Sequence, residues 1–391
     1  MIPFNRPHLT GREFSYISEA VAAGQLAGNG RFTQRCQAWM VQELGCRHAL
    51  LTHSCTAALE MAALLLDLQP GDEIIMPSFT FVSTANAFVL RGATPVFVDI
   101  RPDTLNLDES LIEAAITPRT RAIVPVHYAG VACDMDAIMD IARRHDLVVV
   151  EDAAQGVLAR YKDRPLGSIG HLAALSFHET KNIISGEGGA LLINDERYRQ
   201  RAEILWEKGT DRSRFLRGET SRYTWMDVGS SFLPGELIAA FLWAQLEAAH
   251  DTTARRLEIW RQYAAGTEAL ASFGVSRPTI PADATHNAHL FCLLLPPGAS
   301  RPSILEDLNR RGVNAIFHYV PLHDSPAGRR YGRVAGTMAV TEDCSGRLIR
   351  LPLWVGLQDA DVAQVLAVVT ESLSGVRSAA ASHRPAVAPR P

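Results

Sequence analysis

Residues 176–195 read SFHETKNIISGEGGALLIND and place one lysine, Lys181, between two apolar runs. LAALSF (172–177) overlaps the start of this stretch, and GALLIN (189–194) follows the glycine-rich residues 186–189. Both runs are short and apolar, which is typical of buried strands. A lysine held between them would lose hydration, which lowers its pKa and makes it a better nucleophile towards a carbonyl. A solvated loop lysine is the alternative that this segment alone leaves open.

The segments before this stretch alternate between two patterns. Segments of helical periodicity, such as CTAALEMAALLLD (55–67) and DMDAIMDIARRH (134–145), separate short apolar runs. This alternation predicts an α/β fold, with a mostly parallel sheet covered on both faces by helices. The predicted strands before the lysine lie at residues 49–53, 73–77, 94–100, 121–127 and 147–152.

Shorter strands and helices replace this alternation towards the C-terminus. We expect a large domain over residues 1–245 and a smaller C-terminal α/β domain over residues 246–373. Residues 374–391 are rich in Ala, Pro and Ser and show no apolar periodicity, so we expect a disordered tail.

Composition limits the possible partners and compartments. The chain has 391 residues, 47% of them hydrophobic, and can bury a large core. Its net charge of -4 gives no general attraction to nucleic acid or to an anionic membrane. The longest apolar stretches are interrupted by Glu60 and Asp67, and the N-terminus lacks the apolar segment of a signal peptide. Six scattered cysteines without a C-x-x-C pair fit reduced thiols, so we expect a cytoplasmic protein.

A predicted helix start follows the strand at residues 49–53. In LLTHSCTAALEMAALLL, Ser54 is a candidate N-cap for the helix that follows. The backbone N–H groups of Cys55 and Thr56 would then lie at the positive end of the helix dipole, where a phosphate can bind. An ordinary capped helix is the alternative.

Two acidic residues, Glu151 and Asp152, end the predicted strand in VVVEDAAQG. A carboxylate that emerges from a core needs a cationic or hydrogen-bonding partner, because its unpaired burial is costly or raises its pKa. A protonated heterocycle is one such partner. The alternative is an aspartate that caps the next turn.

The helix start after Ser54, then Asp152, then Lys181 follow one another along the chain. In this order they match three groups of pyridoxal phosphate: its phosphate, its ring nitrogen and its aldehyde. Their order resembles the fold-type I enzymes that use this cofactor. Four segments also resemble the DegT/DnrJ/StrS family of sugar-nucleotide aminotransferases, and the resemblance covers residues 2 to 373. The segments are SFHETKNIISGEGGALLIND, PSFTFVSTANAFVLRGATPVFVDI, VHYAGVACDMDAI and EDAAQG.

The resemblance implies a role for each matched residue around the cofactor. Lys181 forms the Schiff base and carries the proton between the substrate carbon and the cofactor, and Asp152 pairs with the pyridinium nitrogen. Gln155 is expected beside the phenolic oxygen of the ring. Phe81 is expected to stack on the ring, with core packing as the alternative. The implied phosphate ligands are Ser176, Cys55 and Thr56.

One stretch departs from the family pattern. Many members carry an Asn and an Arg in G-x-N-x-R, which reaches the site of the partner subunit, whereas GSSFLPGEL has Ser231 and Leu233 at these positions. A serine can still donate to a phosphate, but leucine cannot replace a charge. We expect a homodimer with shared active sites, with Ser231 as a weaker cofactor ligand.

Two segments are candidates for binding the sugar nucleotide. The loop EKGTDRSRFLRG offers cations for a diphosphate, although a solvated surface loop is the alternative. HYVPLH resembles the sugar-side segment of the family, and no acidic or cysteine partner has the spacing that would make its histidines metal ligands. The candidates are Lys208, Arg212, Arg214 and Arg217 in the loop, and His318, Tyr319 and His323 in HYVPLH.

Within the family, MIPFNRP, EKGTDRSRFLRG and YTWMDVGSSF are most similar to the transaminases that form dTDP-4-amino-4,6-dideoxygalactose. This similarity implies transfer of an amino group from glutamate to carbon 4 of dTDP-4-dehydro-6-deoxy-glucose. One alternative is another ketosugar nucleotide, aminated at carbon 3 or with the other stereochemistry at carbon 4. A second is a regulator that binds the cofactor without turnover, against which the retained Asp152, Gln155, Ser176 and Lys181 argue.

Overall fold

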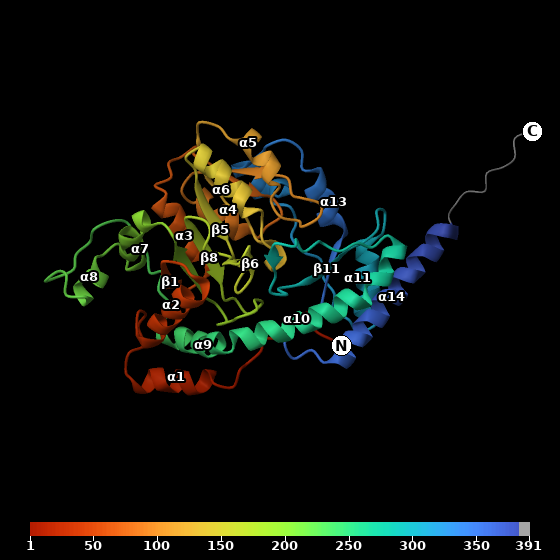
Figure 1. Cartoon of the computed structure of the whole chain (residues 1–391), viewed down its shortest axis with the longest axis horizontal. Coiled ribbons are helices and arrows are strands. Elements are labelled where there is room, and N and C mark those ends of the chain that lie inside the picture. Colours follow the sequence, from red (N-terminus) through yellow and green to blue (C-terminus); the bar gives the residue numbers. More distant parts are fainter. Residues whose placement is uncertain (383–391) are drawn as a thin grey trace, which may run out of the picture.

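The computed structural model describes residues 1–382 of the chain (Figure 1). Its centre is an eight-stranded sheet in the order β1-β9-β8-β5-β4-β2-β3-β12. All strands run parallel except β9, which is antiparallel to both of its neighbours. The strands are β1 (His48–Thr52), β2 (Glu73–Pro77), β3 (Thr94–Val98), β4 (Thr120–Ile123), β5 (Val148–Asp152), β8 (Leu172–Ser176), β9 (Gly189–Ile193) and β12 (Arg333–Val334). The mostly parallel sheet predicted from the apolar runs is confirmed.

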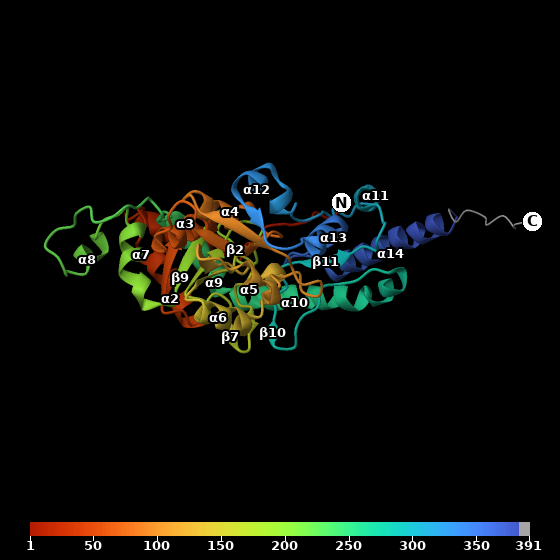
Figure 2. The same ribbon diagram turned by 90° about the horizontal axis from the view of Figure 1, so that it is seen from above.

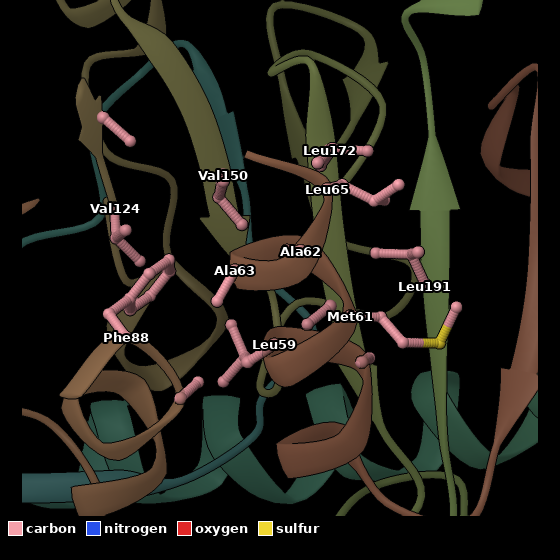
Figure 3. Close-up of a cluster of buried hydrophobic side chains, with 14 of the residues drawn as sticks. Leu59, Met61, Ala62, Ala63, Leu65, Phe88, Val124, Val150, Leu172 and Leu191 are labelled. Carbon is pink, nitrogen blue, oxygen red and sulfur yellow. The ribbon is translucent and has the colours of Figure 1, made fainter. Parts of the chain in front are cut away.

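Both faces of this sheet are buried because its strands are apolar at successive positions. In β8, Leu172 and Ala174 pack into one cluster, whereas Ala173 and Leu175 pack into another. Side chains alternate across a strand, so a strand without polar alternation needs cover on both sides. Helix α3 (Cys55–Leu65) covers one face, and Figure 3 shows its side chains turned towards those of β5, β8 and β9.

The remaining helices of this layer take the two sides of the sheet. On the side of α3 lie α4 (Val82–Val89) and α7 (Arg199–Trp206). On the other side lie α2 (Arg31–Leu44), α5 (Ile112–Ala115), α6 (Met135–Arg144) and α9 (Glu236–Glu247), and α1 (Glu13–Ala22) packs on α9. Two short strands, β6 (Arg160–Tyr161) and β7 (Arg164–Pro165), form a hairpin beside the sheet.

A second, smaller core lies at one end of the molecule (Figures 1 and 2). Strands β11 (Phe291–Leu294) and β13 (Leu348–Leu351) pair there as an antiparallel ribbon. Helices α10 (Ala249–Gly266), α11 (Arg301–Arg310) and α14 (Asp359–Ser382) pack around this ribbon. Shorter elements in the second half are α8 (Arg212–Leu216), β10 (Ala284–Thr285), α12 (Pro326–Tyr331) and α13 (Ala339–Arg347).

Some segments cross the division that we expect at residue 245. Ile2 packs in the second core and forms a bridge with Val313, and β12 extends the large sheet beside β3. The helical region changes from α9 to α10 close to the expected position, and the domain boundary itself stays a prediction. Within residues 1–382, no helix is both long and apolar enough to cross a membrane.

The first part of the expected tail is helical, so the prediction of disorder from residue 374 is wrong there. Helix α14 continues to Ser382, and it is anchored by buried residues such as Val369 and Leu373 in the second core. The residues that follow, SGVRSAAAS, contain three alanines and no proline, and alanine has the strongest helix propensity, so the helix need not stop. Residues 383–391 lie outside the described part of the chain.

Candidate active site

Three strands of the large sheet end together around one space, as ligand sites of open α/β sheets commonly do. Asp152 is the last residue of β5, and Ser176 is the last residue of the adjacent β8. Ser176 lies opposite Gly189 of β9, and Gly189 lies in turn opposite Thr52 of β1. The sheet therefore brings the aspartate, the serine and the start of α3 to one edge.

The start of α3 offers free backbone donors at this edge. Ser54 is extended, and its hydroxyl oxygen accepts from the N–H of Ala57 at 3.0 Å, which confirms the predicted N-cap. Among the described residues, no hydrogen bond uses the backbone N–H of Cys55 or Thr56. The hydroxyl of Ser176 accepts only a long bond of 3.4 Å from the N–H of His178, so its proton is also available.

A glycine is required beside this helix start. A Cβ atom on Gly189 would overlap the backbone between Ser54 and Cys55, so only glycine lets β9 run this close. The close approach at Gly189 is therefore to the start of α3.

Glu151 and Asp152 lie on opposite faces of β5. The Glu151 carboxylate is fully buried and accepts from the N–H groups of Gly167 and Ile169 and from Nε2 of His127 at 2.9 Å. Although burial raises the pKa of Glu151, the hydrogen bond from His127 and the backbone donors leave it below its ordinary value. Glu151 is therefore a structural anion with its partners already in place.

Asp152 faces the site and keeps capacity for a ligand. Its Oδ2 accepts from the hydroxyl of Thr84 at 2.6 Å, and its Oδ1 accepts from the N–H of Ala154 at 3.1 Å. Each carboxylate oxygen has about two lone-pair sites, so each can accept one further hydrogen bond. The bond to Ala154 confirms the turn-capping alternative for Asp152, and its role as a partner for a cation stays a prediction.

Lys181 follows β8 in a turn that its own N–H closes on the carbonyl of His178 at 2.9 Å. Burial lowers the pKa of its amine, and the nearby Cys55 and Asp152 oppose that shift without cancelling it. Within residues 1–382, no hydrogen bond or ion pair joins this amine to another group. The lysine that the sequence singled out is thus a desolvated amine without a protein partner.

Gln155 and Tyr319 connect the two halves of the site. The side-chain oxygen Oε1 of Gln155 accepts from the backbone N–H of Ala129 at 2.7 Å. Its side-chain nitrogen Nε2 donates to the Tyr319 hydroxyl at 2.9 Å. The ring of Tyr319 stacks on His318 with 3.7 Å between centroids. One N–H of Gln155 is left for a ligand.

Tyr128 packs beside His318 and Tyr319, although we assigned it no role from the sequence. Its hydroxyl lies 2.7 Å from Nδ1 of His318. Burial raises the pKa of Tyr128 and lowers the pKa of His318, so the phenol is protonated and the imidazole is neutral. Tyr128 therefore donates to His318. The signal that could have identified Tyr128 was its position within VHYAGVACDMDAI, one of the segments that resemble the family.

The two phenylalanines of SFTF take different environments. Phe79 is 1% exposed and packs against Tyr128 and Tyr319. Phe81, at the N-cap of α4, is 57% exposed, and its ring centroid lies 6.5 Å from that of Tyr319. Core packing is therefore wrong for Phe81, and its stacking on a cofactor stays a prediction.

Within one chain, the predicted ligands Ser231, Lys208 and Arg212 do not lie beside Lys181. Ser231 is exposed and forms a bridge with Glu207, and Lys208 is exposed beside it. Arg212 pairs with the buried carboxylate of Glu207 at 3.1 Å. Within the described residues, no hydrogen bond or ion pair joins these residues to Lys181. The segment that carries α8 extends from the end of the molecule opposite α14 (Figure 2).

The donor set fits a specific kind of ligand. Backbone N–H groups and a serine hydroxyl suit a phosphate, and the free positions on the Asp152 carboxylate suit a protonated ring nitrogen. The amine of Lys181 suits a carbonyl. The charges of both Asp152 and Lys181 reach Cys55, so the start of α3 lies near both groups.

The sequence matches one family over nearly its whole length. The profile of the DegT/DnrJ/EryC1/StrS aminotransferase family covers residues 7–370. The spore coat polysaccharide biosynthesis protein SpsC of Bacillus subtilis (strain 168) is 34% identical over 385 residues, which is 96% of this chain and 97% of that protein. The GDP-perosamine synthase of Caulobacter vibrioides is 35% identical over 374 residues, which is 94% of this chain and 97% of that protein.

Solved structures share the fold. The aminotransferase TlmJ from Streptoalloteichus hindustanus has a TM-score of 0.88 and 30% identity, covering 96% of this chain and all of that one. Spr1654 from Streptococcus pneumoniae, named as a sugar aminotransferase and solved in its PLP form, has a TM-score of 0.87 and 26% identity over 96% of this chain and 99% of that one. The predicted family and the predicted aminotransferase fold are both confirmed.

Proposed function

This chain belongs to the DegT/DnrJ/EryC1/StrS aminotransferase family, and we propose that it aminates carbon 4 of dTDP-4-dehydro-6-deoxy-D-glucose with L-glutamate as donor. The product is dTDP-4-amino-4,6-dideoxy-D-galactose. At the coarser level the chain is a sugar aminotransferase that depends on pyridoxal phosphate. The observation that carries the proposal is the meeting of a free helix start, Asp152 and the unpartnered amine of Lys181 at one sheet edge.

Pyridoxal phosphate supplies, when bound, an aldehyde that carries the amino group and a ring that accepts electron density. The N–H groups of Cys55 and Thr56 and the hydroxyl of Ser176 would hold its phosphate, since all three lack another strong partner. The Asp152 carboxylate would receive the ring N–H. The free amide N–H of Gln155 would face the phenolic oxygen.

Lys181 and Asp152 have the properties that proton transfer needs. Burial lowers the pKa of Lys181, so a larger share of its Nζ is neutral at neutral pH than in water and can take a proton from carbon. Nζ of Lys181 can then return that proton to an adjacent carbon. The Asp152 carboxylate is fixed by Thr84 and Ala154 and would keep a proton on the ring nitrogen, which would let the ring accept electron density.

The two residues expected on the sugar side, His318 and Tyr319, are themselves neutral, although the charge of Arg350 reaches both of them. The neutral imidazole of His318 and the protonated phenol of Tyr319 are both directed into hydrogen bonds rather than ion pairs. Lys208 is exposed and suits a diphosphate, whereas Arg212 first has to share or leave its bond to Glu207. We therefore expect Lys208 to contribute more than Arg212 to nucleotide binding.

A homodimer with shared active sites is part of the proposal. The segment after α8 exposes large apolar side chains, and clustered exposure of this kind marks interaction surfaces. Trp225 is 76% exposed and Met226 is 52% exposed, and Ser231 follows a few residues later. Burial of this segment against a second copy would remove apolar area from water and carry Ser231 to the partner's cofactor site.

The test is an absorption titration of the purified protein with pyridoxal phosphate. We expect a visible band that glutamate removes and dTDP-4-dehydro-6-deoxy-glucose restores, with NMR of the product fixing the configuration at carbon 4. Absence of the band would contradict the cofactor assignment. A band that glutamate removes but this sugar does not restore would retain the aminotransferase and reject the substrate.

A GDP-linked 4-ketosugar is the second candidate substrate. It is favoured by the relative that is named a GDP-perosamine synthase and is 35% identical over 94% of this chain. Steady-state kinetics with each nucleotide sugar compares the two candidates, and a higher kcat/KM with the GDP sugar would replace the dTDP assignment.

A further inference from the structure

Two buried threonines stand behind Asp152 in a row. The hydroxyl oxygens of Thr80 and Thr84 lie 2.8 Å apart, and Thr84 Oγ1 lies 2.6 Å from Oδ2 of Asp152. The three residues are 2%, 1% and 5% exposed, so water has little access to replace any of these bonds. The two threonine hydroxyls are therefore committed to this row, whereas Asp152 keeps free lone pairs.

The direction of the hydrogen bonds follows from the chemistry of the end group. An ionised carboxylate only accepts, so Thr84 must donate its single hydroxyl proton to Asp152. The bond between the threonines then needs the proton of Thr80, which donates to the oxygen of Thr84. The row is ordered from Thr80 through Thr84 to Asp152, and each bond polarises the next.

The row is connected to the start of α3, which would hold the phosphate. Thr84 is the third residue of α4, and its N–H bonds to the carbonyl of Phe81 at 3.1 Å. The hydroxyl of the neighbouring Ser83 lies 2.7 Å from that of Thr56, at the start of α3. The first turn of α4 thus contacts both the helix start that would hold a phosphate and the carboxylate that would receive a ring N–H.

We propose that Thr84, supported by Thr80, is a positioning residue that fixes the rotation of the Asp152 carboxylate so that its free lone pair receives the ring N–H of the cofactor. The inference rests on the proposed function. Thr84 occupies one lone pair of Oδ2, and the N–H of Ala154 occupies one of Oδ1. Loss of the first bond leaves a carboxylate that is held from one side only and has to be ordered when the cofactor binds.

The experiment measures the dissociation constant of pyridoxal phosphate and the thermal midpoint of the cofactor-free protein for a set of full-length variants. Thr84→Val keeps the shape and removes the hydroxyl, Thr84→Ser keeps the hydroxyl, and Thr80→Val removes the supporting donor. We expect about tenfold weaker binding for Thr84→Val, a smaller loss for Thr80→Val and near-normal binding for Thr84→Ser, because one hydrogen bond to a charged group is lost or kept.

A matched control lies in α2, on the other face of the sheet from α3 and α4. Thr33 is a fully buried threonine whose hydroxyl also donates to a buried carboxylate, that of Glu236. Thr33→Val is expected to lower the thermal midpoint and to leave the dissociation constant unchanged. Thr84→Val that behaves like Thr33→Val, with a lower midpoint and normal cofactor binding, would overturn the proposal.

A double-mutant cycle separates action through Asp152 from a direct effect. If Thr84 acts by orienting the carboxylate, Thr84→Val adds little to the loss caused by Asp152→Asn. Additive losses in the cycle would contradict this role, as would Thr84→Ser that binds as weakly as Thr84→Val. Failure of the wild-type protein to bind pyridoxal phosphate would instead contradict the proposed function, which keeps the two failures distinct.

Discussion

The amide nitrogen of Gln155 donates to the hydroxyl of Tyr319 at 2.9 Å, although the two residues are 164 positions apart. Gln155 follows β5 of the large sheet, whereas Tyr319 belongs to a segment between α11 and β13 of the smaller core. This bond holds Tyr319, and His318 stacked on it, beside the sheet edge where Asp152 and Lys181 lie. The site is therefore complete only when both parts of the chain are assembled.

Tyr319→Phe removes the acceptor from this bond and leaves a poorly hydrated N–H of Gln155 without a partner. An unmet hydrogen bond of this kind costs about 1 kcal/mol, so we expect about a fivefold rise in the dissociation constant of pyridoxal phosphate. Fluorescence titration of the cofactor-free protein measures it. Tyr331→Phe, at a residue that is 44% exposed, is the control, and equal effects of the two changes would remove the significance of the bond.

Lys181→Ala is expected to abolish transamination, with a loss of at least about 10³-fold, because the site loses both its nucleophile and its proton carrier. Stability is expected to stay level or to rise, since the amine is desolvated and makes no hydrogen bond within residues 1–382. Product formation and thermal melting are the two measurements. Appreciable turnover in this variant would refute the assignment, and Lys162→Ala, at a surface ion pair, is the control.

Asp152→Asn and Glu151→Gln separate function from structure at adjacent positions. Asp152→Asn is expected to lower kcat by about 100-fold or more with little change in stability, because it removes the charge that holds the ring proton. Glu151→Gln sets an amide N–H group among several donors and is expected to cost about 3 kcal/mol of unfolding free energy. Urea unfolding and steady-state kinetics should show opposite patterns, and similar profiles would contradict this division.

Glu73 makes stability depend on pH. It is 1% exposed, and hydrogen bonds from Arg333, Thr117 and Arg119 lower its pKa to about 2. Because the folded pKa lies below the ordinary value of about 4.3, its contribution is complete above that pH and is lost as the pH falls towards 2.

Glu73→Gln should therefore be less stable than the wild type at pH 7, with a difference that shrinks as the pH falls from about 4.3 towards 2. Urea midpoints at pH 7, 4 and 3 measure the difference. Glu113→Gln, at a largely exposed ion pair, is the comparison and is expected to show little effect at any pH. A constant gap between Glu73→Gln and wild type would mean that the carboxylate does not titrate as described.

Local patterns in the sequence were sufficient for every strand of the large sheet except β12 and for the groups of the site that these strands and α3 carry. Apolar runs predicted the strands, Ser54 predicted the start of α3, and the order of Asp152 and Lys181 predicted a cofactor with a ring nitrogen and an aldehyde. These signals are local because strand burial, helix capping and the residue that ends a strand depend on a few neighbours.

The choice of partners was decided only by the tertiary structure. Glu151 and Asp152 look equivalent in the sequence, yet the pleat of β5 turns one towards His127 and the other towards Thr84. Arg212, taken as a phosphate ligand, already pairs with Glu207.

Helix α14 continues into residues whose composition suggested disorder, because the preceding turns are anchored in the second core. Hydrogen bonds require groups about 3 Å apart in a fixed direction, and the sequence does not specify which distant segments the fold will bring to that distance. The residue types of the site were therefore set by the sequence, and their hydrogen-bond partners by the packing of the sheet, α4 and the smaller core.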